Sequence, residues 1–221
     1  MEIIKLFNAL PGAAAQGLIW GIMAIGVYLT YRILDISDLT VDGTMCTGGA
    51  VCIMCMLNGC NVWVALLAAT GAGMLAGLAT GIFHTFMGIP AILAGILTQL
   101  SLYSVNLKIM GKANQAINVD KYDLLVSLRY IKNVPFFQNT ILIVAIIILV
   151  LIAALYWFFG TELGSSMRAT GCNPNMSRAQ GINTNRNKVL ALMLANGLVA
   201  FSSALLALYR RRLRQQAGRS V

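Results

Sequence analysis

The chain has 221 residues with a formal net charge of +9; 58% of its residues are hydrophobic and only 10% are charged. A soluble domain carries about a quarter charged residues, so this composition excludes an ordinary water-soluble fold. The basic residues lie between apolar blocks, where loops that face anionic lipid place them, and this argues against a nucleic-acid partner. The apolar blocks are also continuous, which excludes the alternating strands of a membrane barrel. We predict an all-α polytopic transmembrane helical bundle surrounded by membrane lipid.

The apolar blocks predict about five to six spans, one of them broken or re-entrant. The first covers residues 12–34. A short apolar stretch at 45–57 contains Gly48-Gly49 and is too short for a full crossing, so we expect the broken or re-entrant helix there. The remaining spans are predicted, in chain order, at 62–83, 89–110, 138–160 and 189–209.

Glycines recur at every fourth position in the span 62–83, at Gly73, Gly77 and Gly81. This spacing makes a smooth ridge that lets another helix approach closely. We therefore expect this face to pack against a neighbouring helix.

The sequence shows none of the residue patterns of an active site. It has no nucleophile with a neighbouring base and no phosphate-binding loop with its lysine. Cys52 and Cys55 have the spacing of a metal or redox pair, but no second pair accompanies them and His84 is remote. Small packing residues explain the cysteines better. We expect no catalytic residue, no metal site and no cofactor.

Acidic residues approach membrane depth in the segment 35–44. An acid beside a broken helix is a functional hypothesis by default, so Asp42, Gly43 and Thr44 are candidates for a translocation pathway. An N-cap role for Asp42 at the start of the next helix explains an acid at this position equally well. Asn106 belongs to a polar stripe in the span 89–110 and is a further pathway candidate, although hydrogen bonds between helices are the commoner use of such residues.

A polar segment at 161–187 separates the last two spans. It predicts a short helix at Leu163–Thr170, a turn at 171–174 signalled by Asn173 before Pro174, and a second helix from Met176. Such a compact hairpin is shaped to dock into a groove of a partner protein. An ordinary solvated loop is the alternative.

Three separated motifs carry a family resemblance. The hairpin holds Leu163-Gly-x-x-x-Arg-Ala-x-Gly-x-Asn173 followed by Ala179-x-Gly-Ile-Asn183. Upstream lie Leu39-Thr-Val-Asp-Gly-Thr44 and Ile89-Pro-Ala-Ile-Leu-Ala-Gly-Ile-Leu-Thr98, the latter leading to Tyr103-Ser-Val-Asn-Leu107. Over about residues 5–208, the sequence resembles bacterial ABC importer permeases of the branched-chain amino acid type. It looks closest to an uncharacterised subgroup whose suggested cargo is tryptophan, tyrosine or other hydrophobic amino acids.

The resemblance implies a transmembrane permease domain at 1–209 in the bacterial plasma (inner) membrane, which moves a small solute, expected to be an amino acid. ATP hydrolysis would reside in a separate cytoplasmic ATP-binding subunit, so this chain itself would not be an enzyme. An extracellular or periplasmic solute-binding protein and a second permease subunit, expected to form a homodimer, would be the other partners. Carried over by position, the cytoplasmic coupling segment 161–187 would dock on the ATP-binding subunit through Gly164, Arg168, Ala169, Gly171, Asn173, Gly181 and Asn183.

The distribution of charge does not fix the orientation. With the hairpin in the cytoplasm, residues 111–137 lie outside, yet residues 161–188 and 111–137 carry four basic residues each. Arg210–Arg214 would also lie outside, against the positive-inside tendency. The family pattern continues with further helices, so we expect an incomplete permease domain and an atypical basic tail at 210–221, such as a frameshift or truncation would leave. The alternatives are a secondary carrier or channel without an ATPase, a non-transporting scaffold and a non-functional fragment of a permease.

Overall fold

The computed structural model describes residues 2–111 and 140–219, and all regular elements in these two ranges are helical. The expected all-α fold is therefore confirmed. In chain order the elements are α1 (Glu2–Tyr28), the π-helix η1 (Leu29–Ile33), α2 (Val41–Leu57), α3 (Val62–Thr85), α4 (Ala91–Met110), α5 (Thr140–Gly160), α6 (Glu162–Cys172), α7 (Pro174–Ala179) and α8 (Thr184–Arg219).

The described residues contain four helical stretches that are long and apolar enough to cross a membrane: Ala13–Ile33, Val62–Thr85, Ala91–Met110 and Thr184–Leu208. A fifth crossing is made if α5 and α6, which meet at an angle of 78°, are counted as one bent span. The 17-residue α2 is the short apolar helix that the sequence predicts. The chain is therefore a multi-pass membrane protein.

The break in helical geometry near α2 lies at a different place from the one that the sequence predicts. α2 runs without a break through Gly48-Gly49, because Gly48 packs against the backbone of α8 at Ala200. The chain instead leaves helical geometry before α2, at residues 34–40, where Asp35 has a φ of 53°. This extended link carries the chain from the end of η1 back into the bundle.

Two other boundaries also differ from the prediction. The second helix of the hairpin begins at Pro174 rather than Met176, and Gly171 belongs to α6, so the turn is reduced to Asn173. α8 begins five residues earlier than the predicted span 189–209 and continues as a helix to Arg219. The polar segment predicted at 111–137 lies almost entirely outside the described residues, and the atypical nature of the tail stays a prediction.

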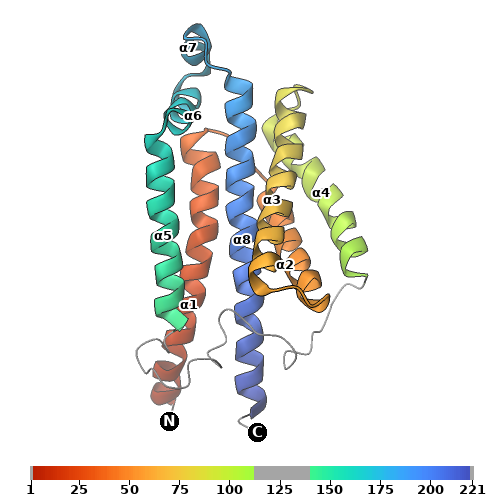
Figure 1. Ribbon diagram of the computed structural model, residues 1–221, viewed down its shortest axis with the longest axis vertical. Coiled ribbons are helices and arrows are strands. Elements are labelled where there is room, and N and C mark those ends of the chain that lie inside the picture. The colour runs from red at the N-terminus through yellow and green to blue at the C-terminus, as the bar shows by residue number, and fades with distance from the viewer. Residues whose placement is uncertain (1, 112–139, 220–221) are drawn as a thin grey trace.

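α8 lies in the centre of the bundle, with α1 and α5 on one side and α3 and α4 on the other (Figure 1). The predicted glycine ridge of α3 lies directly against it. A Cβ atom at Gly77 would lie 2.4 Å from the carbonyl oxygen of Leu192, and one at Gly73 would lie 2.6 Å from that of Asn196. No larger residue fits there without a shift of the backbone, so the predicted packing role of the ridge is confirmed.

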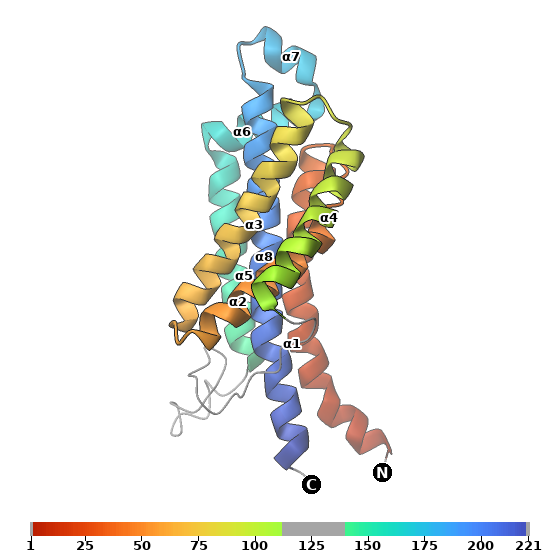
Figure 2. The ribbon, with the colours of Figure 1, turned by 90° about the vertical axis from the view of Figure 1, so that its right-hand side faces the viewer.

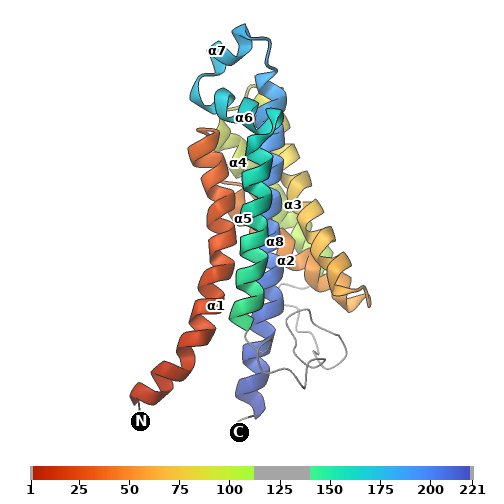
Figure 3. The same ribbon diagram turned by 60° about the vertical axis from the view of Figure 1, so that its left-hand side comes forward.

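Different elements lie at the two ends of the bundle. α6 and α7 form a hairpin at one end, beyond the last turn of η1 (Figure 2). The last turn of α4, the first turn of α5 and the outer ends of α1 and α8 lie toward the other end (Figure 3). The hairpin is therefore separated from these ends by the length of the spans.

The packing at Gly77 generates a test of the fold. Gly77→Ala places a methyl group against the backbone of α8, and we expect it to destabilise the protein by about 1–3 kcal/mol. The matched control is Gly71→Ala in the same helix, where a Cβ meets nothing within 4 Å. There the better helix propensity of alanine stabilises by up to about 1 kcal/mol. Thermal unfolding in mild detergent measures both, and equal melting temperatures would contradict the α3–α8 contact.

Candidate functional site

The hairpin begins with a sharp bend between α5 and α6. Thr161 caps α6: its hydroxyl accepts from the amide of Gly164 at 3.4 Å and donates to the carbonyl oxygen of Phe158 at 2.6 Å. A Cβ at Gly164 would lie 2.4 Å from this same oxygen. Gly164, a predicted docking residue, is therefore needed for the bend itself.

α6 then crosses the end of η1 in direct backbone contact. A Cβ at Gly171 would lie 1.8 Å from the carbonyl oxygen of Ile33, so only glycine fits at this crossing. Met167 of α6 is buried in a small apolar cluster with Leu34 and Leu192. α6 is thus packed on the end of the bundle, and this half of the hairpin is not a solvated loop.

A buried amide fixes α6 to α8. The Nδ2 atom of Asn187 donates to the hydroxyl of Ser166 at 3.2 Å and to that of Thr170 at 3.0 Å. Sequence analysis did not single out Asn187, although an asparagine just before an apolar run is a visible signal. Its partners lie 17 and 21 residues earlier in the chain, so they could not be identified from spacing.

Three further predicted docking residues shape the far part of the hairpin. The Oδ1 atom of Asn173 accepts from the amides of Asn175 and Met176 at 3.1 Å each and so caps α7. Gly181 has a φ of 81° in the turn before α8, a conformation that favours glycine. The Oδ1 atom of Asn183 accepts from the amide of Arg186 at 3.2 Å, at the start of α8.

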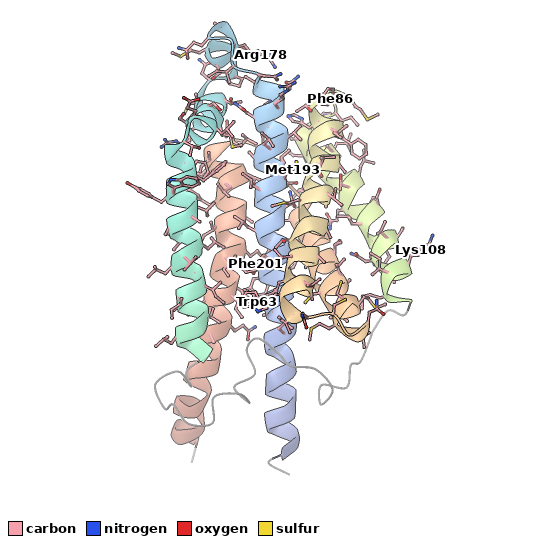
Figure 4. The ribbon with its side chains drawn as sticks, viewed as in Figure 1. Trp63, Phe86, Lys108, Arg178, Met193 and Phe201 are labelled. Carbon is pink, nitrogen blue, oxygen red and sulfur yellow. The ribbon has the colours of Figure 1, made fainter. Side chains whose placement is uncertain are left out.

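The outer surface of the hairpin carries apolar and basic side chains. Leu163 is 55% exposed and Met176 is 60% exposed. Arg168 is exposed, and its guanidinium donates to the carbonyl oxygen of Phe159 at 2.9 Å, which bridges α6 to the end of α5. Ala169 is half-buried beside it. Arg178 marks this end of the molecule in Figure 4, whereas Lys108 lies about halfway along the molecule in this view.

A second group of polar side chains lies in the middle of the bundle, around Asn196. This residue stands at the midpoint of the span Thr184–Leu208 and is 0% exposed. Its Nδ2 atom donates to Oδ2 of Asp38 at 2.7 Å, and its Oδ1 atom accepts from the hydroxyl of Thr44 at 3.0 Å. One amide therefore joins the link before α2, α2 itself and α8. We call these three residues the Asn196 triad.

A row of threonines continues this network toward α4. The hydroxyls of Thr40 and Thr80 lie 2.8 Å apart, and that of Thr80 donates to that of Thr98 at 3.0 Å. All three side chains are buried. Together with the Asn196 triad, they join α2, α3, α4 and α8 through polar contacts at membrane depth.

The four predicted pathway residues gather around α2 and α4. Asp42 is exposed in the first turn of α2, and the helix is capped at Thr40, so the N-cap interpretation of Asp42 is wrong. A Cβ at Gly43 would lie 3.1 Å from the Cα atom of Gln99 in α4. Thr44 belongs to the Asn196 triad. Asn106 lies two turns beyond Gln99 in α4; it is 8% exposed, and its Oδ1 atom has no hydrogen-bond partner among the described residues.

Metal ligands are not brought together in the part of the chain that the structure describes. No group of three or more His, Cys, Asp or Glu side chains there could hold a metal ion. The Nδ1 atom of His84 lies 2.9 Å from the carbonyl oxygen of Ile89, so the histidine closes the turn between α3 and α4.

One protein family matches this chain over nearly its full length, including the hairpin, the short helix α2 and the mid-membrane network. The model of the family "Branched-chain amino acid transport system / permease component" matches residues 10–218. The chain belongs to this family. No solved structure matches it.

Several relatives are permeases with different named cargoes. The chain is 38% identical over 192 residues to a tyrosine transport system permease protein of Clostridioides difficile, covering 87% of this chain and 62% of the relative. It is 34% identical over 202 residues to an uncharacterized protein of Rickettsia prowazekii, covering 90% and 68% respectively. It is 27% identical over 188 residues to a galactofuranose transporter permease protein of Escherichia coli, covering 84% and 52%. The chain thus spans about 62% of the length of the Clostridioides relative.

The contact of Asn187 with α6 yields a testable prediction. Asn187→Ala removes two hydrogen bonds that hold the hairpin, worth about 1–3 kcal/mol together, so the amides of Ser166 and Thr170 should exchange with deuterium about tenfold faster. The control is Asn185→Ala, because Asn185 is half-buried in the same helix and its side chain bonds to no described residue. Equal exchange in both variants would show that Asn187 does not hold the hairpin.

Proposed function

We propose that this chain is the transmembrane permease subunit of an ATP-driven importer in the bacterial inner membrane. The observation that carries the proposal is the α6–α7 hairpin: α6 packs on the central helix α8, and the outer surface of the hairpin points away from the bundle. Family membership supports the same reading. Its partner would be a cytoplasmic ATP-binding subunit, in which the ATPase activity would reside.

The outer surface of the hairpin suits docking into a groove. Leu163 and Met176 are exposed apolar side chains, and Arg168 and Arg178 are exposed cations on the same hairpin. Apolar side chains bordered by cations would fit a groove with an apolar floor and acidic rim, since such complementarity guides association. Of the predicted docking residues, Arg168 is the one whose exposed charge can meet the partner, whereas Gly164 and Gly171 act by shaping the hairpin.

The exposed carboxylate of Asp42 indicates where the pathway lies. α2 begins at the level of the mid-membrane network, so the first turn of α2 is deep in the hydrocarbon region. A charge facing lipid at that depth costs about 2.5–3.5 kcal/mol, whereas a water-filled pathway removes this cost. We infer that the α2–α4 face borders the pathway and that a second copy of the chain encloses it.

The named cargo of the Clostridioides relative makes tyrosine the first solute to test. An amino acid would reach the pathway from the end opposite the hairpin, delivered by an external solute-binding protein. Sugars are the competing class, because more distant relatives bear names of sugar permeases. Competition of unlabelled solutes with labelled tyrosine distinguishes the two classes.

The partner is tested by purifying the tagged chain from native membranes in mild detergent. We expect an ATP-binding subunit to accompany the native chain and Lys108→Glu, which makes the same charge change well away from the hairpin. Arg168→Glu should reduce its recovery at least fivefold. Arg168→Lys keeps the positive charge, so recovery close to the native value in this variant assigns the effect to the charge. Recovery of no ATPase with the native chain would instead favour a carrier or channel.

The pathway is tested by neutralising Asp42. We expect Asp42→Asn to lower tyrosine uptake about fivefold or more and to leave the melting temperature unchanged, because the carboxylate is already hydrated. Asp35→Asn is the matched control: Asp35 is also exposed, and asparagine tolerates its φ of 53°. A raised melting temperature with unchanged uptake in Asp42→Asn would show that Asp42 faces lipid and is outside the pathway.

A further inference from the structure

The short helix α2 packs on α3, α4 and α8, and α8 holds it at three successive points. Asn196 bonds to Thr44, the backbone at Ala200 touches Gly48, and the hydroxyl of Ser203 donates to the carbonyl oxygen of Met45. These contacts follow one side of α8 through the lower half of its span. α2 and α8 therefore move as one unit unless these contacts break.

Asn196 makes the polar contacts at the start of α2, and every polar atom of its side chain is hydrogen-bonded. Its Oδ1 atom accepts from Thr44, and its Nδ2 atom donates both to Asp38 and to the carbonyl oxygen of Leu192 at 3.1 Å. Asp38 in turn accepts from the amide of Thr40 at 2.8 Å, at the position that caps α2. The amide of Asn196 thus fixes both the entrance to α2 and its first turn.

The hairpin is attached to the other side of the same helix. Asn187, which binds α6, precedes Asn196 by nine residues. Nine residues of α-helix correspond to about 13.5 Å along the axis and half a turn around it. One continuous helix therefore carries the hairpin on one face near its start and α2 on the opposite face at mid-membrane. A tilt or rotation of α8 displaces both.

We propose that Asn196 is a positioning residue for transport, which ties α2 to α8 so that a movement of the coupling hairpin shifts the pathway face that carries Asp42. The inference rests on the proposed function and adds the element that transmits the movement. Asn196 itself is fully buried and acts through Asp38 and Thr44 rather than on the solute.

The inference is tested in the reconstituted complex with its ATP-binding subunit, with labelled tyrosine as the probe. The quantity measured is tyrosine imported per ATP hydrolysed, which does not depend on how much complex folds. Asn196→Asp places a second carboxylate against Asp38, and we expect this ratio to fall at least fivefold. Combining it with Asp38→Asn restores a carboxylate–amide pair and should return the ratio to within twofold of the native value. Asn185→Asp, in the same helix, is the control and should leave the ratio unchanged.

Thr44→Val is the variant to use if the Asn196→Asp chain does not assemble with the ATP-binding subunit. Thr44→Val removes the bond from α2 to Asn196, and its matched control is Thr70→Val, because Thr70 bonds only to the carbonyl oxygen of Leu67 in its own helix. We expect the ratio to fall at least twofold in the first variant and to remain native in the second. Uptake and hydrolysis that fall in parallel would indicate a structural role alone and would overturn the inference.

A measurement that does not depend on the solute distinguishes failure of this inference from failure of the proposed function. Cys46 is exposed in α2, one turn from Asp42, and can be labelled with a water-soluble maleimide after the exposed Cys60 and Cys172 are changed to serine. We expect trapping with ATP and vanadate to change its labelling rate at least threefold in the native complex but not in Asn196→Asp. If trapping changes the labelling rate of Cys46 in Asn196→Asp as much as in the native complex, this inference alone is overturned. A native chain that binds no ATP-binding subunit overturns the proposed function and the inference with it.

Discussion

The close packing of neighbouring helices on α8 is the constraint on which the rest of the structure depends. In a membrane, lipid chains are as apolar as leucine, so helices associate by van der Waals contact and hydrogen bonds rather than by the hydrophobic effect. Gly73 and Gly77 of α3 and Gly48 of α2 allow backbones to approach within reach of such contacts. The same closeness brings the amide of Asn196 within hydrogen-bond distance of Asp38 and Thr44.

A helix that begins at membrane depth needs partners for its free backbone groups, because no bulk water is available to them. The link before α2 meets this need internally: the amide of Ile36 donates to the carbonyl oxygen of Thr30 at 3.0 Å, and that of Thr40 donates to the carboxylate of Asp38. Asp38 thus satisfies the backbone with one oxygen and binds α8 with the other. The irregular segment is stable only because it is packed into the bundle.

Sequence analysis predicted the features that depend on neighbours along the chain. Continuous apolar blocks indicated the spans, and the spacing of Gly73, Gly77 and Gly81 indicated a packing face. The Asn196 triad was missed, because its members lie about 150 residues apart in sequence and a lone asparagine in an apolar helix does not reveal its partner. The short length of 45–57 and its Gly48-Gly49 pair predict a broken or re-entrant helix; the break is wrong, because contact with α8 outweighs the weak intrinsic cost of glycine in a helix.

Asp38 and Asp42 lie in different environments. Asp38 is half-buried and receives hydrogen bonds from Asn196 and from the amide of Thr40, so its charge is compensated within the protein. Asp42 lies four residues later, on the exposed side of the first turn of α2. A carboxylate stable at this depth requires water or a partner. The arrangement is explained if Asp38 holds the helix in place so that Asp42 faces an aqueous path, with the apolar faces of α4 and α5 left for lipid or for a second copy of the chain.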